Sequence, residues 1–119
     1  MKRILIAEDN RDFASVLKLA LEAEGYAVSL AENGREAIAM QRRAAAEVLI
    51  TDLVMPESDG FEAIDAFRKE FPATKLIVVS GASRLDAGRY LEVAKLVGAD
   101  ATFRKPFRVE DLLRALRAL

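Results

Sequence analysis

The sequence contains no cysteine, no histidine and no tryptophan among its 119 residues. Without cysteine the chain can form no disulfide and offers no thiolate to a metal ion. Without histidine it has no imidazole base and no histidine-ligated zinc site, and it cannot itself carry a phosphohistidine. Neither sign of charge dominates, because 18 basic and 19 acidic residues leave a net charge of −1. This balance argues against direct binding to nucleic acid or to a membrane surface.

Long hydrophobic runs are also missing. The apolar run at residues 4–7 is too short for the core of a signal peptide, and the acidic pair Glu8-Asp9 follows it at once. No stretch approaches the ~20 apolar residues of a membrane span. We therefore expect a cytoplasmic location and no membrane partner. The length and the 52% apolar content predict one globular domain over residues 1–119.

Short apolar segments alternate with segments of helical period along the whole chain. The expected strands are residues 4–7, 26–30, 48–50, 76–79 and 101–103. The expected helix faces are Phe13, Val16, Leu17 and Ala20; Ala37, Met40 and Ala44; Phe61, Ile64 and Phe71; Leu91, Ala94 and Val97; and Val109, Leu112, Leu113 and Leu116. Strict alternation predicts a parallel sheet with helices on both faces. Ligands bind such sheets at the carboxyl ends of the strands.

Turn and cap residues separate these segments. Gly25 and Gly98 are expected to stop helices, Asn33-Gly34 to begin one, and Pro72 to follow the end of another. Residues 56–60 are expected to form a loop in which Ser58 or Asp59 caps the next helix.

Polar or charged residues stand at the carboxyl ends of four of the five expected strands. These residues are Glu8 and Asp9, Asp52, Ser80 and Lys105. Three carboxylates brought close together repel one another, so they require either protons or a cation among them. Oxygen-only ligands favour a hard ion, and Mg²⁺ commonly uses one or two carboxylates together with a phosphate. A central carboxylate could then attack phosphorus while the metal and the lysine stabilise the negative charge.

Each motif taken alone has an ordinary structural explanation. Glu8-Asp9 suits a strand-to-helix turn, Asp52 can cap a loop, and Ser80 and Lys105-Pro106 can be purely structural. Together, the motifs resemble the receiver domain of two-component response regulators over essentially the whole chain. The residues that carry the resemblance are Glu8-Asp9, Asp52-Leu53-Val54-Met55-Pro56 with Asp59-Gly60, Ser80-Gly81-Ala82 and Lys105-Pro106-Phe107.

The resemblance implies an α/β fold of the flavodoxin-like (βα)5 type, a three-layer sandwich with a five-stranded parallel sheet of order 2-1-3-4-5. It also implies that Asp52 accepts a phosphoryl group from a phosphohistidine on a sensor histidine kinase or a histidine phosphotransfer protein. A downstream protein target or a fused output domain would then respond to a changed face around helix 4, strand 5 and helix 5. Such a domain has no outside substrate and catalyses only its own phosphorylation and dephosphorylation.

The resemblance assigns a role to each site residue. Mg²⁺ (or Mn²⁺) is held by Asp9, Asp52 and the Val54 carbonyl directly, and by Glu8 mainly through water. Lys105 pairs with Asp52 and then with the phosphoryl group, Ser80 moves to hydrogen-bond that group, and Phe103 is the switch aromatic. The Lys105-Pro106 peptide bond is expected to be cis, which is rare enough to be a sharp prediction.

Two departures from the family pattern carry further hypotheses. Val54 and Ala82 are small where they would flank the phosphoryl group, which predicts a phosphate comparatively open to water or to a phosphatase. Residues 83–90 are longer than usual, either as a longer fourth helix or neutral insertion, or as an altered partner surface.

Three rival functions stay open from the residues. The chain could be a pseudo-receiver that binds partners without phosphorylation. It could be a Mg²⁺-dependent aspartyl-phosphate phosphatase, although Val54 stands where a second aspartate would be wanted. It could be a flavodoxin-like carrier, although carboxylates at the strand ends disfavour a flavin phosphate. Whether the chain acts alone or as part of a longer regulator is left open.

Overall fold

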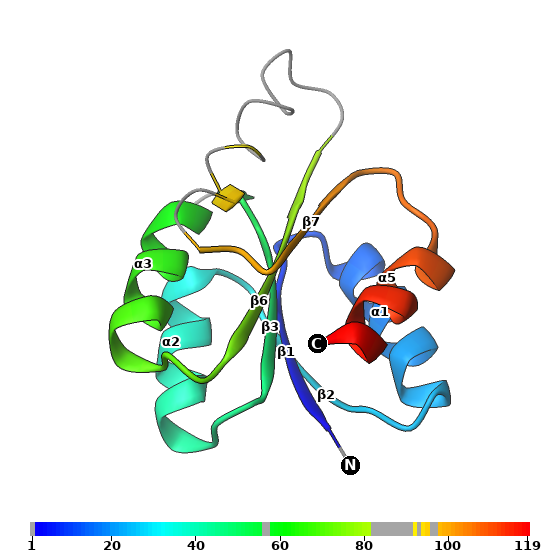
Figure 1. The fold of residues 1–119 in the computed structure, drawn as a ribbon, viewed down its shortest axis with the longest axis horizontal. Helices are drawn as coiled ribbons and strands as arrows, with labels where there is room; N and C mark the ends of the chain where they lie inside the picture. The colour runs from blue at the N-terminus through cyan, green and yellow to red at the C-terminus, as the bar shows by residue number, and fades with distance from the viewer. Residues whose placement is uncertain (1, 56–57, 82–91, 93, 96–97) are drawn as a thin grey trace.

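The computed structural model describes all residues except 1, 56–57, 82–91, 93 and 96–97 (Figure 1). Five parallel strands form one sheet in the spatial order β2-β1-β3-β6-β7. Their bounds are β1 Arg3–Ala7, β2 Ala27–Ala31, β3 Val48–Asp52, β6 Lys75–Ser80 and β7 Ala101–Arg104. Counted along the chain, this is the order 2-1-3-4-5, so the predicted topology is confirmed.

Helices cover both faces of the sheet, which gives three layers (Figure 1). Helices α1 (Arg11–Ala23) and α5 (Val109–Ala118) lie on one face, and α2 (Gly34–Arg43) and α3 (Gly60–Glu70) lie on the other. Residues 92, 94 and 95 are also helical, and Ala94 packs into the core on the α2–α3 side. The predicted flavodoxin-like class is confirmed.

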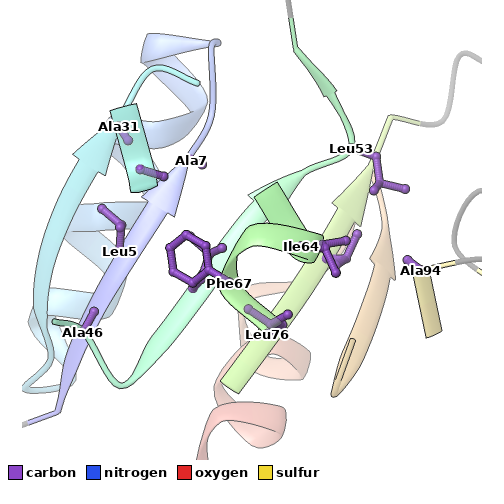
Figure 2. Packing of buried hydrophobic residues seen from close by; sticks show 12 residues of the cluster. Leu5, Ala7, Ala31, Ala46, Leu53, Ile64, Phe67, Leu76 and Ala94 are labelled. Carbon is purple, nitrogen blue, oxygen red and sulfur yellow. The ribbon is translucent and has the colours of Figure 1, made fainter. Parts of the chain in front are cut away.

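The strands are buried on both sides, as continuous apolar runs predict. In β1, Ile4 and Ile6 face the cluster under α1 and α5, whereas Leu5 and Ala7 face the cluster under α2 and α3. Figure 2 shows this second cluster, which joins Phe67 and Ile64 of α3 to Leu5 of β1 and Leu76 of β6. The sheet is therefore the rigid platform from which the loops at its carboxyl edge project.

Asparagine and glycine define the helix ends where the sequence predicts them. Asn33 caps α2 by accepting the Glu36 N–H at 2.9 Å. Gly25 has φ 94° and follows Glu24, the C-cap of α1, and Gly98 has φ 119° after the helical residues 94 and 95. Both positions take the left-handed conformation that favours glycine at a helix end.

The predicted face of α1 is wrong at Val16, which is 65% exposed. The buried residues are Ala14, Leu17 and Leu21, with Phe13 partly buried beside them. Apolar residues occur on several sides of α1, so more than one helical stripe fits its sequence. The structure buries the stripe that faces α5 and the sheet.

The predicted face of α2 is wrong at Ala44, which is exposed and lies beyond the last helical residue. Gln41 is buried in this helix instead. A polar side chain is invisible to an apolar periodicity search, and its burial is explained by its hydrogen bonds. Its Nε2 donates to the Ala46 carbonyl and to Thr74 Oγ1, each at 3.0 Å.

The expected loop over residues 56–60 is wrong where it is described. Ser58–Asp59 form the short strand β5, which pairs antiparallel with β4 (Val54–Met55), and α3 begins directly at Gly60. The predictions for Ala82, residues 83–90, Leu91 and Val97 fall outside the described residues. Within the described parts of the chain, no helix has both the length and the apolar character needed to cross a bilayer.

Candidate functional site

The candidate site lies at the carboxyl edge of the sheet, where the four strands β1, β3, β6 and β7 end. Asp52 is the last residue of β3, and Ser80 is the last residue of β6. The Glu8 N–H donates to the Ala31 carbonyl at 3.0 Å, and the Lys105 N–H donates to the Ser80 carbonyl at 2.8 Å. Backbone hydrogen bonds that continue the ladders therefore fix the first residues after β1 and β7.

Lys105 bridges two carboxylates at this edge. Its Nζ lies 2.6 Å from Glu8 Oε1 and 2.9 Å from Asp52 Oδ2. The lysine side chain is 20% exposed, and those of Glu8 and Asp52 are 2% and 8% exposed. Low exposure strengthens such charge-assisted hydrogen bonds and makes loss of either partner costly.

A third carboxylate, Asp9, completes an acidic cluster. One carboxylate oxygen from each of Glu8, Asp9 and Asp52 lies within 4.8 Å of the other two. Asp9 is exposed, unlike the other two. Because one ammonium faces three carboxylates, the cluster keeps an excess of negative charge, which suits a cation with oxygen ligands.

The pKa values of Glu8 and Lys105 reflect this crowding. Burial raises the pKa of the Glu8 carboxyl, and the charge of Asp52 adds to the increase, although hydrogen bonds from Lys105 and the Asn10 N–H oppose it. Burial on its own would lower the pKa of Lys105. Its hydrogen bonds to Glu8 and Asp52 outweigh that effect and raise it. The lysine is thus held firmly in its charged form.

Ser80 brings a buried hydroxyl to the same edge. Its side chain is 1% exposed, and among the described residues its Oγ has no hydrogen-bond partner. A buried hydroxyl without a partner is costly, so such a group is commonly reserved for a ligand or a second conformation. The Ser80 hydroxyl could therefore donate a hydrogen bond to a ligand bound at this edge.

The remaining predicted site residues are Phe103, Val54 and Pro106, and the structure shows their positions in the chain. Phe103 lies in β7, in register with Val79 of β6, and its partly buried ring contacts Phe107. Val54 lies in β4, two residues after Asp52, and its backbone carbonyl as a metal ligand stays a prediction. The Lys105-Pro106 peptide bond is cis, as predicted.

Comparison with known proteins identifies the family. The family model of the response regulator receiver domain matches residues 4–117. The chain belongs to the response regulator receiver family. A response regulator receiver protein from Anaeromyxobacter sp. (strain Fw109-5) is 39% identical over 113 residues, which are 95% of this chain and 46% of that protein. The transcriptional regulatory protein CpxR of Escherichia coli (strain K12) is 31% identical over 119 residues, which are 100% of this chain and 49% of that protein.

Solved structures agree with this assignment. The CheY-like receiver domain protein from Methanospirillum hungatei JF-1 superposes with a TM-score of 0.87 at 31% identity, covering 99% of this chain and 92% of that one. This receiver spans about half the length of the curated relatives it matches. The comparisons therefore establish a receiver domain, and leave the activity of the whole protein to be proposed.

The structure of this receiver also shows site neighbours that sequence reasoning did not place there. Asn10 caps α1 by accepting the Phe13 N–H at 3.0 Å, and its own N–H donates to Glu8 Oε2 at 3.1 Å. The Phe13 ring lies next to Lys105, with 4.4 Å between Nζ and the ring centroid. Asn10 follows the acidic pair as a helix cap should, which was a usable signal. Phe13 looked like one more core residue, so no signal singled it out.

Proposed function

We propose that this receiver accepts a phosphoryl group on Asp52 as a step in a two-component or phosphorelay pathway. The observation that carries the proposal is the pairing of a buried Asp52 with the Lys105 ammonium at 2.9 Å, inside a cluster with Glu8 and Asp9. An ion pair with purely structural value would not need two further carboxylates beside it. The surplus of negative charge is better explained by a site that binds a metal ion and a phosphoryl group.

The residues of the chain divide the work of the transfer. A carboxylate oxygen of Asp52 donates its electron pair to phosphorus and forms the new P–O bond. The P–N bond to the donor imidazole breaks, and its electron pair leaves with the imidazole nitrogen. Lys105 stabilises negative charge on a phosphoryl oxygen, and the Ser80 hydroxyl supplies a hydrogen bond to another. Phe103 would respond to the movement of Ser80.

The acidic cluster fits a hard divalent cation. Glu8, Asp9 and Asp52 supply only oxygen atoms, and the Val54 carbonyl stands two residues beyond Asp52. Mg²⁺, or Mn²⁺ in its place, would neutralise charge on the phosphoryl group and on the attacking carboxylate. In the metal-free protein, burial raises the pKa of Glu8, and the charge of Asp52 adds a smaller contribution in the same direction.

The partners follow from the same reaction. A sensor histidine kinase or a histidine phosphotransfer protein would supply the phosphoryl group. The relatives of about twice this length include a transcriptional regulator, so the response would pass to a fused output domain or to a separate protein target. The face that includes β7 and α5 would carry the change, and the protein would act in the cytoplasm. In this role the receiver catalyses only its own phosphorylation and dephosphorylation.

Intact mass spectrometry tests the proposal. The protein is incubated with Mg²⁺ and acetyl phosphate, and the mass is followed with time. We expect one phosphoryl adduct that is stable in mild acid, labile in base and dependent on the metal. Asp52→Asn should abolish it, and Lys105→Met should slow its formation by at least about tenfold, since Lys105 stabilises charge in the transition state.

The outcomes separate the rival functions. No adduct from a folded, metal-binding protein would support a pseudo-receiver that binds partners without phosphorylation. Steady release of inorganic phosphate from an added phosphate monoester would support a phosphatase. An adduct that persists in Asp52→Asn would place the chemistry at another residue.

A further inference from the structure

The charged end of Lys105 lies over the face of the Phe13 ring. The Lys105 Nζ lies 4.4 Å from the ring centroid. An ammonium within ~6 Å of an aromatic face is attracted by the negative charge on that face. Phe13 belongs to the first turn of α1, whereas Lys105 follows β7, so the contact joins two distant parts of the chain.

The position of the ring matters because lysine is a poor self-positioning residue. Its ammonium is carried by a flexible four-carbon stem, and it has three N–H donors without a fixed direction. Among the described residues, Nζ donates to two oxygens, those of Glu8 and Asp52. The ring of Phe13 is a further described neighbour of the same nitrogen. It restricts the ammonium without competing for it as an oxygen would.

The ring itself is held from two directions. The Phe13 N–H donates to Asn10 Oδ1, which fixes the first turn of α1. Phe107 meets the Phe13 ring edge-on, with 5.9 Å between the centroids and 84° between the planes. Phe107 in turn packs against Phe103 at 5.6 Å and 41°. A continuous aromatic row therefore runs from β7 to the ring beneath the ammonium.

We propose that Phe13 is a positioning residue for phosphoryl transfer, and that its ring face holds the Lys105 ammonium where the phosphoryl oxygen arrives. This inference rests on the proposed function of Lys105 and adds a residue to which that function assigns no role. Phe13 touches neither the phosphoryl group nor the metal ligands in this account. It acts only through Lys105.

The first test replaces the ring while keeping apolar volume. Phe13→Leu should slow phosphorylation of Asp52 by acetyl phosphate about fivefold, the rate equivalent of one partly buried cation–π contact. Phe13→Tyr and Phe13→Trp keep an aromatic face and should retain the wild-type rate within about twofold. The affinity for Mg²⁺, measured without phosphodonor, should stay the same in all three variants, because none of them alters a carboxylate.

Phe71→Leu is the matched control. Phe71 is also partly buried and also packs against another ring, that of Phe67 at 5.2 Å, but it lies at the opposite end of the sheet near Thr74. It should leave the rate unchanged in the folded protein. A similar loss in both leucine variants would show that general loosening, and not the cation contact, slows the reaction.

A double-mutant cycle with Lys105→Met isolates the coupling. If Phe13 acts through the ammonium, Phe13→Leu should have no further effect on the rate in the Lys105→Met background. An equal fivefold loss in both backgrounds would overturn the positioning role.

A spectroscopic measurement keeps this inference separable from the proposed function. In NMR spectra of the metal-free protein, the ε-methylene protons of Lys105 should be shifted upfield by the ring, and the shift should be lost in Phe13→Leu and retained in Phe13→Tyr. Lack of any adduct in the wild-type protein would overturn the proposed function. A wild-type rate in Phe13→Leu, or an unchanged lysine shift, would overturn the role of Phe13 alone.

Discussion

The two ends of the sheet both bury polar side chains, but they treat them differently. At the amino end, Gln41 donates to the Ala46 carbonyl and to Thr74 Oγ1, and its Oε1 accepts the Ala46 N–H at 2.9 Å. At the carboxyl end, Ser80 Oγ has no partner among the described residues, and burial raises the pKa of Glu8.

This difference separates stability from function within one small domain. A buried polar group that is fully hydrogen-bonded contributes to the native structure. A buried polar group left short of partners, or held with surplus charge, costs stability unless a ligand supplies what is missing. We therefore infer that the hydrogen-bonded Gln41 at the amino end stabilises the fold, whereas the carboxyl end is suited to binding ligands.

The largest stability effect should come from the amino end. Gln41→Leu removes three buried hydrogen bonds and leaves the Ala46 N–H without its side-chain acceptor, although the Ala46 carbonyl keeps the Thr74 hydroxyl. Each buried hydrogen bond of this kind contributes ~1 kcal/mol. We expect the free energy of unfolding to fall by about 3 kcal/mol, measured by urea denaturation. A loss of less than about 0.5 kcal/mol would mean that Gln41 does not stabilise the fold, and the difference between the two ends of the sheet would disappear.

Metal binding should stabilise the protein only through the carboxyl end. At a free Mg²⁺ concentration of about 100 times Kd, the free energy of unfolding should rise by about 2.7 kcal/mol, because the ion binds the folded state. Gln41→Leu should gain the same increment from its lower starting value. Asp9→Asn should lose most of the gain, and an undiminished gain in that variant would move the metal site elsewhere.

Glu8 should show the cost of the empty cluster through the pH dependence of stability. In the metal-free protein the folded pKa of Glu8 is raised above its ordinary value of 4.5. The stabilising contribution of its proton is thus fully present below the unfolded pKa and is lost as the pH rises through the folded pKa. Glu8→Gln keeps a side-chain oxygen that can accept from Lys105 and removes only the buried surplus charge. It should flatten this loss and stabilise the metal-free protein at neutral pH by about 1 kcal/mol.

Urea denaturation between acid and neutral pH checks this expectation. With Mg²⁺ added, the wild-type protein should become the more stable of the two, because the variant has lost a carboxylate that contributes to metal binding. A Glu8→Gln protein less stable than wild type without metal would show that Glu8 serves the fold and not the site.

The smallest effect on stability should come from Arg42, the exposed residue next to Gln41. Arg42 pairs with Glu70 at 3.0 Å, but the two side chains are 60% and 42% exposed. Exposed ion pairs contribute little because water and salt screen them. Arg42→Ala should leave the urea midpoint unchanged within experimental error. A clear decrease in the midpoint would show that the ion pair contributes to the stability of the amino end.

The sequence predicts much of the fold because strand periodicity and turn residues are local signals. Asn33, Gly25 and Gly98 mark helix ends where the structure places them. The face of α1 was harder, since Val16 and Leu17 both fit an apolar stripe and only tertiary packing chooses between them. The burial of Gln41 cannot be predicted from sequence periodicity, because it depends on hydrogen-bond partners from Ala46 and Thr74.

The candidate site was predictable because its residues stand at or just after the carboxyl ends of neighbouring strands in a parallel sheet. Glu8, Asp52 and Lys105 meet as expected. The ring of Phe13 beneath the ammonium was not predictable, because an aromatic residue on a helix gives the same sequence signal whether it fills the core or supports a charge.

The most direct test compares the phosphorylation rates of two variants, one altered at each end of the sheet. Gln41→Leu and Lys105→Met are incubated with acetyl phosphate and Mg²⁺ under conditions where both are folded, and the adduct on Asp52 is quantified by mass spectrometry. We expect the wild-type rate for Gln41→Leu and a rate at least about tenfold lower for Lys105→Met. A slow Gln41→Leu beside an unaffected Lys105→Met would contradict this expectation.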